Sequence, residues 1–411
     1  MPATLTEDQD YVAFCSQRLA DPYPLFARLR AEDPIHWSQA LKMWLVTRYD
    51  DAYDGLRDTA RLSSSRAGMY ADPLTEQNRA RARPLIDHIL HWLQNVDAPQ
   101  HTRLRKLVNI AFTPRMLEGL KPRVEAITNE LLDDVCASPQ TDLVRSFCLP
   151  LPAMVICQML GVPSQYHKTF RGCVDQMLYF ASGAGPGLND AIDEANRGLK
   201  TLIGFFHDLI EQRRIQPRDD MISAMAAAEE DGDRLNRDEM FGLCVFLFVA
   251  GHETTMSLLS SGTLALLQHP EQFNKLKANP DGLIKTAVEE FLRYEPPVTR
   301  GVRRATCDFE WRGRSIRKDQ TITILLGAAN RDGEQFPDPD RLDIERRPNK
   351  HLGFGFGPHF CLGAQLARIE AHIAFLAIVR RLPDMRLDTD RVEYQPAFGV
   401  RSLVQLPVRL T

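Results

Sequence analysis

One cysteine of this chain lies where the local sequence favours a reactive thiolate. Residues 354–363 read FGFGPHFCLG, so Cys361 ends a glycine-rich stretch just before residues 362–380, whose apolar spacing predicts a helix. A helix N-terminus offers unpaired backbone N–H groups and a positive dipole end, and both favour thiolate over thiol. A buried thiolate needs a cationic partner, which a ferric iron supplies. The alternative is an ordinary buried cysteine in a glycine-rich turn.

The residues around this cysteine suit a flat ligand. Gly357 and Gly363 remove side chains where a flat macrocycle would approach the backbone. Phe354 is placed to pack near the sulfur and keep water away. His359, two residues before the cysteine, is a candidate cation for an acidic ligand group, the alternative being a loop histidine with partners of its own.

A second group of chemically active residues interrupts the apolar segment 243–267. A helix that is apolar all round belongs in the core, so polar residues at its middle need partners or a task. Ala250 and Thr254 are four residues apart and share a face, with Gly251 beside them, and Glu253 precedes the threonine. This arrangement leaves room for a small ligand. The alternative is a threonine bonded to its own i−4 carbonyl beside a capped acid.

Several charged residues are placed to pair or to bind anions. Glu290 and Arg293 are three residues apart on a predicted helix and are able to form an ion pair, although such pairs are common on solvated faces. His101 and Arg105 are i,i+4 neighbours at the start of another predicted helix, and Arg303 lies in a predicted strand region. For each of these cations, the alternative is an ordinary surface charge.

Composition sets the class of protein. The 411 residues are 44% hydrophobic and 25% charged, which indicates a globular protein with a large core. The net charge of −4 gives no basic field for nucleic acid. No apolar run reaches the ~18 residues of a membrane span, and Met1–Asp10 lacks the features of a signal peptide, so we expect a cytoplasmic protein. Eight scattered cysteines without CxxC pairs indicate mostly reduced, buried thiols rather than zinc ligands.

The expected elements are mainly helical. Patterning predicts helices over 23–32, 283–294 and 362–380, a mostly helical stretch over 102–267, strands over 35–37, 43–48 and within 300–328 including 321–326, and an irregular segment over 336–360. Irregular segments this long are uncommon unless they serve a site. We expect a mainly α protein with a small β region and a single domain over residues 1–411.

The sequence resembles the cytochrome P-450 family. Phe354, Gly357, Cys361 and Gly363 fill the four marked places of that family's haem-binding loop. The likeness runs from about Tyr23 to the C-terminus. It is strongest to the soluble bacterial branch that oxidises fatty-acyl, polyketide or macrolide substrates, through the phrases LGAANRD and QHPE. The resemblance implies the family's helical prism around a buried haem.

The resemblance also implies residue roles. Cys361 would ligate the iron of haem b, and Ala250 would contact the cofactor. The haem propionates would be held by His101, Arg105, Arg303 and His359, with His351 a weaker candidate. Thr254 would hydrogen-bond the bound O2 and Glu253 would help to relay protons. Glu290, Arg293 and Arg341 would form a structural triad, although Leu342 stands where the family often has Phe.

The activity implied is reductive activation of O2. One oxygen atom leaves as water and the other enters a C–H bond or an alkene of a largely apolar small molecule, and the thiolate favours O–O cleavage. No flavin- or dinucleotide-binding motif is present, so a ferredoxin or flavodoxin with its reductase would supply electrons. A basic patch for that carrier is predicted at Arg103, Lys106, Arg346, Arg347 and Lys350.

By the same resemblance, five places in the sequence line the substrate pocket, namely 85–92, 176–187, 246–254, 298–302 and Phe398. Its predicted members are Trp92, Phe246, Val249, Ala250, Val298, Thr299, Arg300 and Phe398. Strand alternation puts Arg300 and Arg303 on opposite faces, so Arg300 either faces the pocket and binds an acidic or polar substrate group or turns outward to solvent.

Three other activities compete with this prediction. Haem-thiolate peroxygenases and isomerases commonly lose the acid–threonine pair that this chain keeps. A haem sensor or carrier usually has an attached output domain. A cysteine-nucleophile hydrolase would need a base poised on Cys361.

Overall fold

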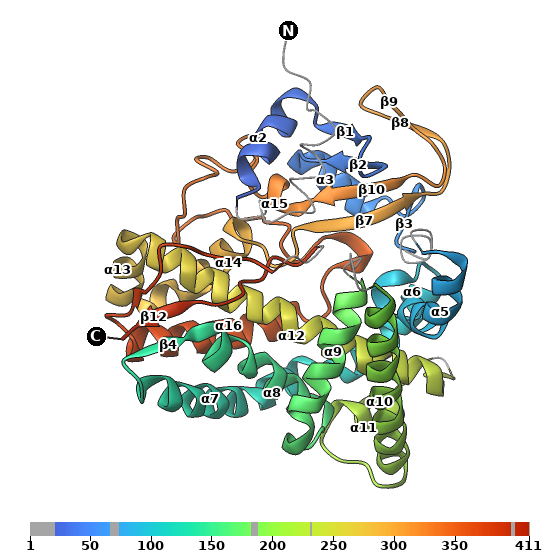
Figure 1. Ribbon diagram of the computed structural model, residues 1–411, viewed down its shortest axis with the longest axis horizontal. Helices are drawn as coiled ribbons and strands as arrows, with labels where there is room; N and C mark the ends of the chain where they lie inside the picture. Colours follow the sequence, from blue (N-terminus) through green and yellow to red (C-terminus); the bar gives the residue numbers. More distant parts are fainter. Residues whose placement is uncertain (1–20, 66–73, 182–187, 231, 396–398, 411) are drawn as a thin grey trace. The chain divides into compact units, whose positions relative to one another are not determined.

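The computed structural model describes residues 21–65, 74–181, 188–230, 232–395 and 399–410. The chain divides into two compact units, each described by itself below. The first comprises Met1–Ser63, Thr128–Pro150 and Glu253–Thr411, and the second comprises Ser64–Ile127 and Leu151–His252. Within the described residues the protein is mainly helical with small sheets, which confirms the predicted fold class (Figure 1).

The first unit combines a five-stranded sheet with helices. The sheet has the strand order β1 (Ile35–Ser38), β2 (Met43–Val46), β10 (Thr321–Leu325), β7 (Arg300–Ala305) and β3 (Leu62–Ser63), and only the β2–β10 pair is parallel. Its helices are α2 (Tyr23–Glu32), α3 (Tyr49–Arg57), α13 (Pro270–Ala278), α14 (Pro280–Tyr294), α15 (Leu326–Ala329), α16 (Ala364–Arg381), the π-helix η3 (Val144–Cys148) and the 3-10 turn η5 (Gly357–His359). Its smaller sheets are β11 (Arg386–Leu387)–β12 (Pro407–Arg409)–β4 (Gln140–Asp142) and β8 (Phe309–Trp311)–β9 (Arg314–Ile316).

The second unit is almost entirely helical. It contains α5 (Glu76–Leu90), η2 (Leu93–Asn95), α6 (Gln100–Ala111), η4 (Ser164–Tyr166), α9 (His167–Ala181), α10 (Leu188–Ile215), α11 (Met221–Ala227) and the hairpin β5 (Glu229–Glu230)–β6 (Asp233–Arg234). Three helices contribute residues to both units: α7 (Pro114–Cys136), α8 (Pro150–Leu160) and α12 (Arg237–Gln268). Phe170 of α9 packs edge-to-face on Phe205 and against Phe206 of α10, at centroid distances of 4.6 and 5.5 Å, and the three rings join α9 to α10.

The apolar run in β2 explains why the sheet is buried on both faces. Successive strand residues point to opposite sides. Trp44 and Val46 join the core that includes Ala52 of α3, whereas Leu45 joins the core that includes Phe26 of α2. A continuous apolar strand is typical of a sheet covered on both faces, and α2 and α3 supply that cover.

Helix α12 is the most apolar long element. It is the one helix in the described part of the chain that is long and apolar enough to cross a membrane, yet 72% of its apolar window is buried inside the protein. In its C-terminal half, a Cβ added to Gly262 would lie 2.6 Å from Phe375 of α16 and 3.0 Å from Phe291 of α14. Glycine is therefore required there for the three helices to pack.

Most predicted elements are confirmed, with shifts at their ends. The helix predicted over 23–32 is α2. The helix predicted over 283–294 begins at Pro280, because the Asn279 side chain accepts a hydrogen bond from the Gly282 amide and Pro280 suits the first helical turn. Residues 182–187, which belong to the stretch 176–187 expected to line the pocket, lie outside the described residues.

Candidate active site

The loop before α16 is closed by main-chain hydrogen bonds around Cys361. The Cys361 amide donates to the Phe354 carbonyl at 3.0 Å, and the Phe360 amide donates to the Gly357 carbonyl at 3.0 Å. Cys361 is half-buried and lies three residues before Ala364, the first residue of α16. The predicted placement of the cysteine just before a helix is therefore confirmed.

The two loop glycines, Gly357 and Gly363, have different surroundings. Gly357 has φ +73°, and a Cβ there would lie 2.9 Å from the Leu56 carbonyl oxygen of α3, so this glycine permits the loop to pack on α3. Its part in admitting a flat ligand stays a prediction. A Cβ on Gly363 would meet no atom of the described chain within 4 Å. The space beside Cys361 at Gly363 fits a flat group such as haem.

Other described cysteines are poor thiolates by comparison. Cys148, Cys157 and Cys244 are buried, and burial raises the pKa of all three thiols, that of Cys157 to about 12. Cys361 differs from them in being half-buried at a helix start. Cys15 lies outside the described residues.

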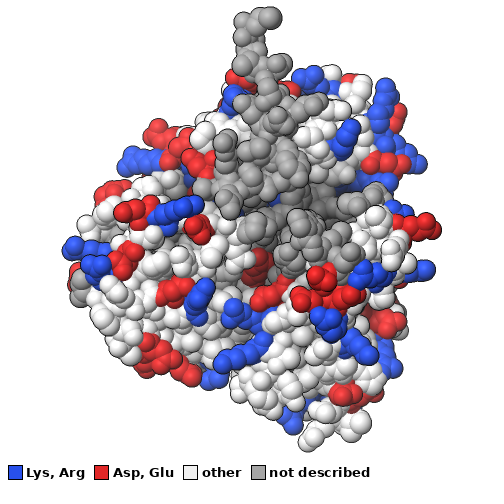
Figure 2. Space-filling model, in the orientation of Figure 1, with Lys and Arg blue, Asp and Glu red and all other residues white. Residues whose placement is uncertain are grey.

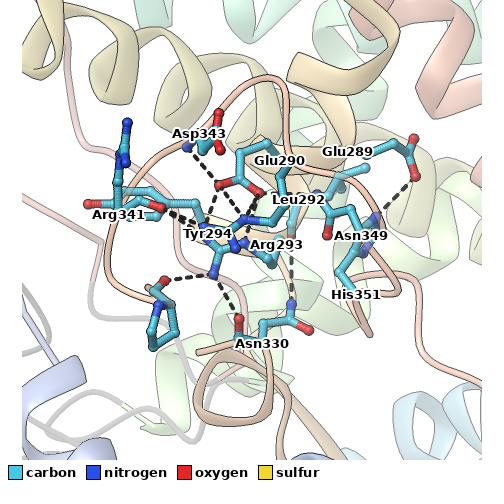
Figure 3. A network of polar contacts seen from close by, with 12 residues as sticks. Glu289, Glu290, Leu292, Arg293, Tyr294, Asn330, Arg341, Asp343, Asn349 and His351 are labelled. Carbon is cyan, nitrogen blue, oxygen red and sulfur yellow. Dashed lines mark hydrogen bonds and ion pairs between the residues drawn. The ribbon is translucent and has the colours of Figure 1, made fainter. Parts of the chain in front are cut away.

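The predicted Glu290–Arg293 pair forms and is completely buried. Arg293 donates to both Glu290 carboxylate oxygens at 2.8 Å, and both side chains are 0% exposed (Figure 3). Arg293 also donates to the carbonyls of Asn330, Pro339 and Arg341, at 2.9, 2.7 and 3.1 Å. The pair therefore anchors the irregular segment that leads to the thiolate loop.

The third member of the triad is not the side chain that we predicted. Arg341 contributes its carbonyl, and its side chain points away from Glu290 in Figure 3. The guanidinium on Glu290 belongs to Arg346, at 3.2 Å, and Asn349 donates to the same carboxylate at 3.1 Å. The segment curls back after Arg341, which brings the later arginine onto the buried acid.

A neighbouring polar network was not signalled by any motif. Arg368 of α16 binds both carboxylate oxygens of Glu289 at 2.7 and 2.8 Å, and the Arg368 guanidinium carbon lies 4.5 Å from the ring centroid of Phe354. Glu289 also lies 3.1 Å from Nε2 of His351. His351, which we weighed as a propionate ligand, is thus engaged by an acid of α14.

The predicted propionate ligands fall in both units. Arg303 lies on β7, is 7% exposed, and donates to the Val302 carbonyl at 2.9 Å. A Cβ on Gly301 would lie 3.4 Å from the Leu56 side chain and 4.0 Å from Nη1 of Arg303. Leu56 also borders Gly357, so Gly301 of β7 and the thiolate loop approach the same residue of α3. His359 is half-buried in η5.

His101 and Arg105 lie on α6 of the second unit. His101 is buried, and burial together with the Arg105 charge lowers its pKa, with Asp97 opposing. Their placement relative to Cys361 stays a prediction.

The acid–threonine segment lies within a continuous helix. Ala250, Glu253 and Thr254 are half-buried along α12, whereas His252 and Thr255 are buried. A Cβ on Gly251 would lie 3.1 Å from Ile156 of α8. Gly251 therefore permits the packing of α8 on α12, and its place beside a ligand space stays a prediction.

The predicted pocket residues are buried or half-buried where they are described. Trp92 and Phe246 are in ring contact within the second unit, with centroids 6.0 Å apart, and Val249 is buried nearby in sequence. Val298 and Thr299 are half-buried in the first unit, where the Thr299 amide donates to the Gly399 carbonyl at 3.0 Å. Phe398 lies outside the described residues.

Arg300 is 7% exposed, so it does not turn outward to solvent. It begins β7, which runs without a break to Ala305. Whether the Arg300 side chain faces the substrate pocket stays a prediction.

Two members of the predicted basic patch are compensated by acids. Arg103 donates to Asp233 at 3.0 Å and also to Glu239, and Arg346 is engaged by Glu290. Arg347 and Lys350 are exposed. On the face drawn in Figure 2, basic and acidic side chains of the described residues are interspersed.

Comparisons with known proteins place the chain in a family. A family model described as Cytochrome P450 matches residues 87–395. The chain is 39% identical over 400 residues to the polyketide biosynthesis cytochrome P450 PksS of Bacillus subtilis (strain 168), covering 95% of this chain and 96% of that protein. It is 40% identical over 399 residues to the cytochrome P450 monooxygenase PikC of Streptomyces venezuelae, covering 95% of this chain and 91% of that protein.

The fold agrees with solved structures at comparable identity. The structure of P450BioI in complex with a hexadec-9Z-enoic acid-ligated acyl carrier protein aligns with a TM-score of 0.87 at 37% identity, over 96% of this chain and 98% of that chain. The Bacillus subtilis PksS structure aligns with a TM-score of 0.86 at 38% identity, over 98% of this chain and 99% of that chain. The chain belongs to the cytochrome P450 family and is a haem-thiolate monooxygenase.

Proposed function

We propose that this enzyme binds haem b through Cys361 and uses O2 to hydroxylate or epoxidise a largely apolar small molecule. The observation that carries the proposal is the closed loop around Cys361, with open space beside Gly363. Haem supplies the activation of O2 when it is bound. The protein's part is to hold the group, exclude water and place the substrate and a proton.

Named residues divide these tasks. The Cys361 sulfur ligates the iron, and Ala250 contacts the macrocycle. Arg303 and His359, with His101 and Arg105, pair with the two propionates, because carboxylates leaving water need charged or hydrogen-bonding partners. Arg303 is already desolvated at 7% exposure, which suits a buried carboxylate.

The iron ligand is tested by the carbon monoxide complex of the reduced protein. We expect the red-shifted Soret band of thiolate ligation, and Cys361→Ser and Cys361→His should abolish it. Either variant retaining an unchanged thiolate band would refute Cys361 as the ligand. Cys157→Ser is the matched control, since Cys157 is a buried thiol of high pKa and its loss should leave the band in place.

We assign proton delivery to Thr254 and Glu253. Thr254→Ala should keep haem and substrate binding but release reducing equivalents as hydrogen peroxide, because Thr254 and Glu253 would hold the proton that the O2 chemistry of the bound haem requires. General acid–base roles are worth ~10²–10⁴ in rate, and solvent replaces part of this one. Unchanged coupling of electron use to product would count against the assignment.

The substrate proposed is acyl or polyketide-like. The relatives compared above are named for polyketide biosynthesis and for a complex with an acylated carrier protein, and the predicted pocket stretches are mainly apolar. Arg300, buried on β7, would bind an acidic or polar end of the substrate. Acidic amphiphiles should then give tighter spin-shift binding than their esters, and Arg300→Leu should erase that preference while haem content stays intact. An unchanged acid-to-ester ratio in the variant would remove this role.

Electrons would come from a ferredoxin or flavodoxin with its reductase, in the cytoplasm. With Arg103 and Arg346 paired to acids, the exposed members of the predicted patch that would serve an acidic carrier are Lys106, Arg347 and Lys350. Reduction should slow with salt, since exposed charges are screened over ~8 Å at physiological ionic strength. An Arg347→Glu/Lys350→Glu variant that is reduced at the wild-type rate, with the same salt response, would contradict this surface. We keep the proposal that residues 1–411 act as one domain.

A further inference from the structure

The side chain of Phe354 is held from one side by an arginine of the helix that follows the thiolate loop. The guanidinium carbon of Arg368 lies 4.5 Å from the Phe354 ring centroid. The same guanidinium donates two hydrogen bonds, at 2.7 and 2.8 Å, to the Glu289 carboxylate of α14. One planar group therefore meets an acid and an aromatic ring together, which a lysine ammonium does less well.

A second contact holds the chain just before Phe354. His351 lies 3.1 Å from Glu289 through Nε2, and its Nδ1 accepts the Gly353 amide at 3.1 Å. The His351 ring centroid is 6.0 Å from that of Phe354, and Phe360 approaches Phe354 edge-on at 6.3 Å. Glu289 thus fixes both the arginine on the ring and the backbone that carries the ring.

Phe354 transmits this placement to Cys361. Its main-chain carbonyl accepts the Cys361 amide hydrogen at 3.0 Å. A shift of Phe354 would therefore move the N–H that fixes the backbone at the cysteine. The nearby guanidinium also carries a permanent positive charge, whose field favours the reduced state of any redox centre within its range.

We propose that Arg368, anchored by Glu289, is a positioning residue that holds Phe354 and through it the thiolate loop, and that this ion pair biases the reduction potential of the iron. The inference rests on Cys361 being the iron ligand proposed above. In this role Arg368 acts through Phe354 and not by direct contact with the substrate or the sulfur.

The chain contains a matched control on the same two helices. Arg380 of α16 binds both carboxylate oxygens of Asp281 of α14, at 2.7 and 2.8 Å. This pair joins the same two helices, but it uses one guanidinium nitrogen, Nη2, for both oxygens, and it lies at the far end of α16 from the loop. A merely structural role of Arg368 would make the two arginines equivalent, apart from the greater exposure of the Arg380 pair.

The experiment compares Arg368→Gln, Arg368→Lys, Glu289→Gln, the Arg368→Gln/Glu289→Gln double variant and Arg380→Gln, each as the haem-loaded enzyme. We expect the red-shifted carbon monoxide band to be lost at least threefold faster in Arg368→Gln and Glu289→Gln. Hydrogen exchange of the peptide spanning 352–363 should accelerate in both. Arg368→Lys should recover part of the band stability, and Arg380→Gln should match the wild type.

The reduction potential distinguishes the effect of the Arg368 and Glu289 charges from the effect of the loop's position. Removing the cation in Arg368→Gln should lower the ferrous-to-ferric ratio at a fixed applied potential about threefold. For a one-electron couple at 59 mV per tenfold, this corresponds to a reduction potential lower by about 28 mV. Glu289→Gln should shift the ratio in the opposite direction, because it removes an anion. The double variant should return towards the wild-type potential and keep the unstable band.

Arg368→Gln indistinguishable from Arg380→Gln in band stability and potential would overturn the proposal. So would potential shifts of the same sign in Arg368→Gln and Glu289→Gln. A wild-type enzyme without the red-shifted band would instead remove Cys361 as the ligand, so the two failures are distinguishable.

Discussion

Glu289 and Glu290 are consecutive residues of α14 with opposite environments. Glu290 is 0% exposed and is bound by Arg293, Arg346, Asn349 and the Asp343 amide. The side chain of Glu289 is 27% exposed and is bound by Arg368 and His351. The two acids hold consecutive parts of the same irregular segment, Glu290 the stretch around 339–349 and Glu289 the stretch 351–354 through His351 and Arg368.

The difference shows how burial divides the work of two neighbouring charges. A buried carboxylate that loses a charged partner leaves a poorly compensated charge in a medium of low dielectric, so each such loss costs much stability. A half-exposed carboxylate that loses a partner is solvated by water, so its contribution to stability is small. The hydrogen bonds of such a carboxylate can still fix the position of an arginine and, through it, of an aromatic ring such as Phe354. We therefore expect the Glu290 network to determine whether the segment folds and the Glu289 network to determine how the loop is placed.

The largest expected effect comes from breaking the buried pair. Arg293→Met should lower the free energy of unfolding by about 3–5 kcal/mol, because it leaves the Glu290 carboxylate without its bidentate partner. Urea unfolding measures this. The exposed pair supplies the control, and Arg380→Met should stay within about 0.5 kcal/mol of the wild type. A loss below about 1 kcal/mol in Arg293→Met would erase the contrast between the two acids.

An effect of intermediate size on the free energy of unfolding should distinguish Arg346 from Arg341. Arg346→Gln should cost about 1–3 kcal/mol, because its guanidinium, 8% exposed, bonds Glu290 and the Pro337 carbonyl at 2.6 Å. Arg341→Gln should change stability by no more than about 0.5 kcal/mol, since only its carbonyl is used. The reverse order in urea unfolding would restore Arg341 as the third member of the triad.

The smallest effect is a pH dependence confined to Glu289. Burial raises the pKa of Glu289, but hydrogen bonds and charges from Arg368 and His351 outweigh it and lower the pKa to about 2 from 4.5. A lowered acid pKa contributes stability above pH 4.5 that is lost as pH falls towards 2. For this half-exposed pair the contribution is at most about 1 kcal/mol.

The wild type should therefore lose its stability advantage over Glu289→Gln as the pH falls from about 5 to about 2. Chemical unfolding at several pH values measures this gap, the difference in free energy of unfolding between the wild type and Glu289→Gln. A gap that stays constant over this range would show that Glu289 gains nothing from its charged partners.

Local sequence was sufficient for features whose causes are local. The helix over 23–32 and the helix start after Cys361 follow from apolar spacing and from residues that suit helix ends. The Glu290–Arg293 pair is three residues apart on one helix, so the helix itself brings the two charges together. The loop FGFGPHFCLG was also enough to indicate the family, because its four marked residues lie within ten consecutive positions.

Only tertiary packing decided the features that depend on distant chain segments. Arg341 and Arg346 are indistinguishable as residue types, and the curl of the chain between them selects the second for Glu290. A side chain at Gly357 would crowd Leu56, and one at Gly251 would crowd Ile156; both neighbours are far away in the sequence. The Glu289–Arg368 contact spans 79 residues. Periodicity reports on the face that a residue occupies, and carries no information about which distant group meets that face, because that is set by how whole helices pack.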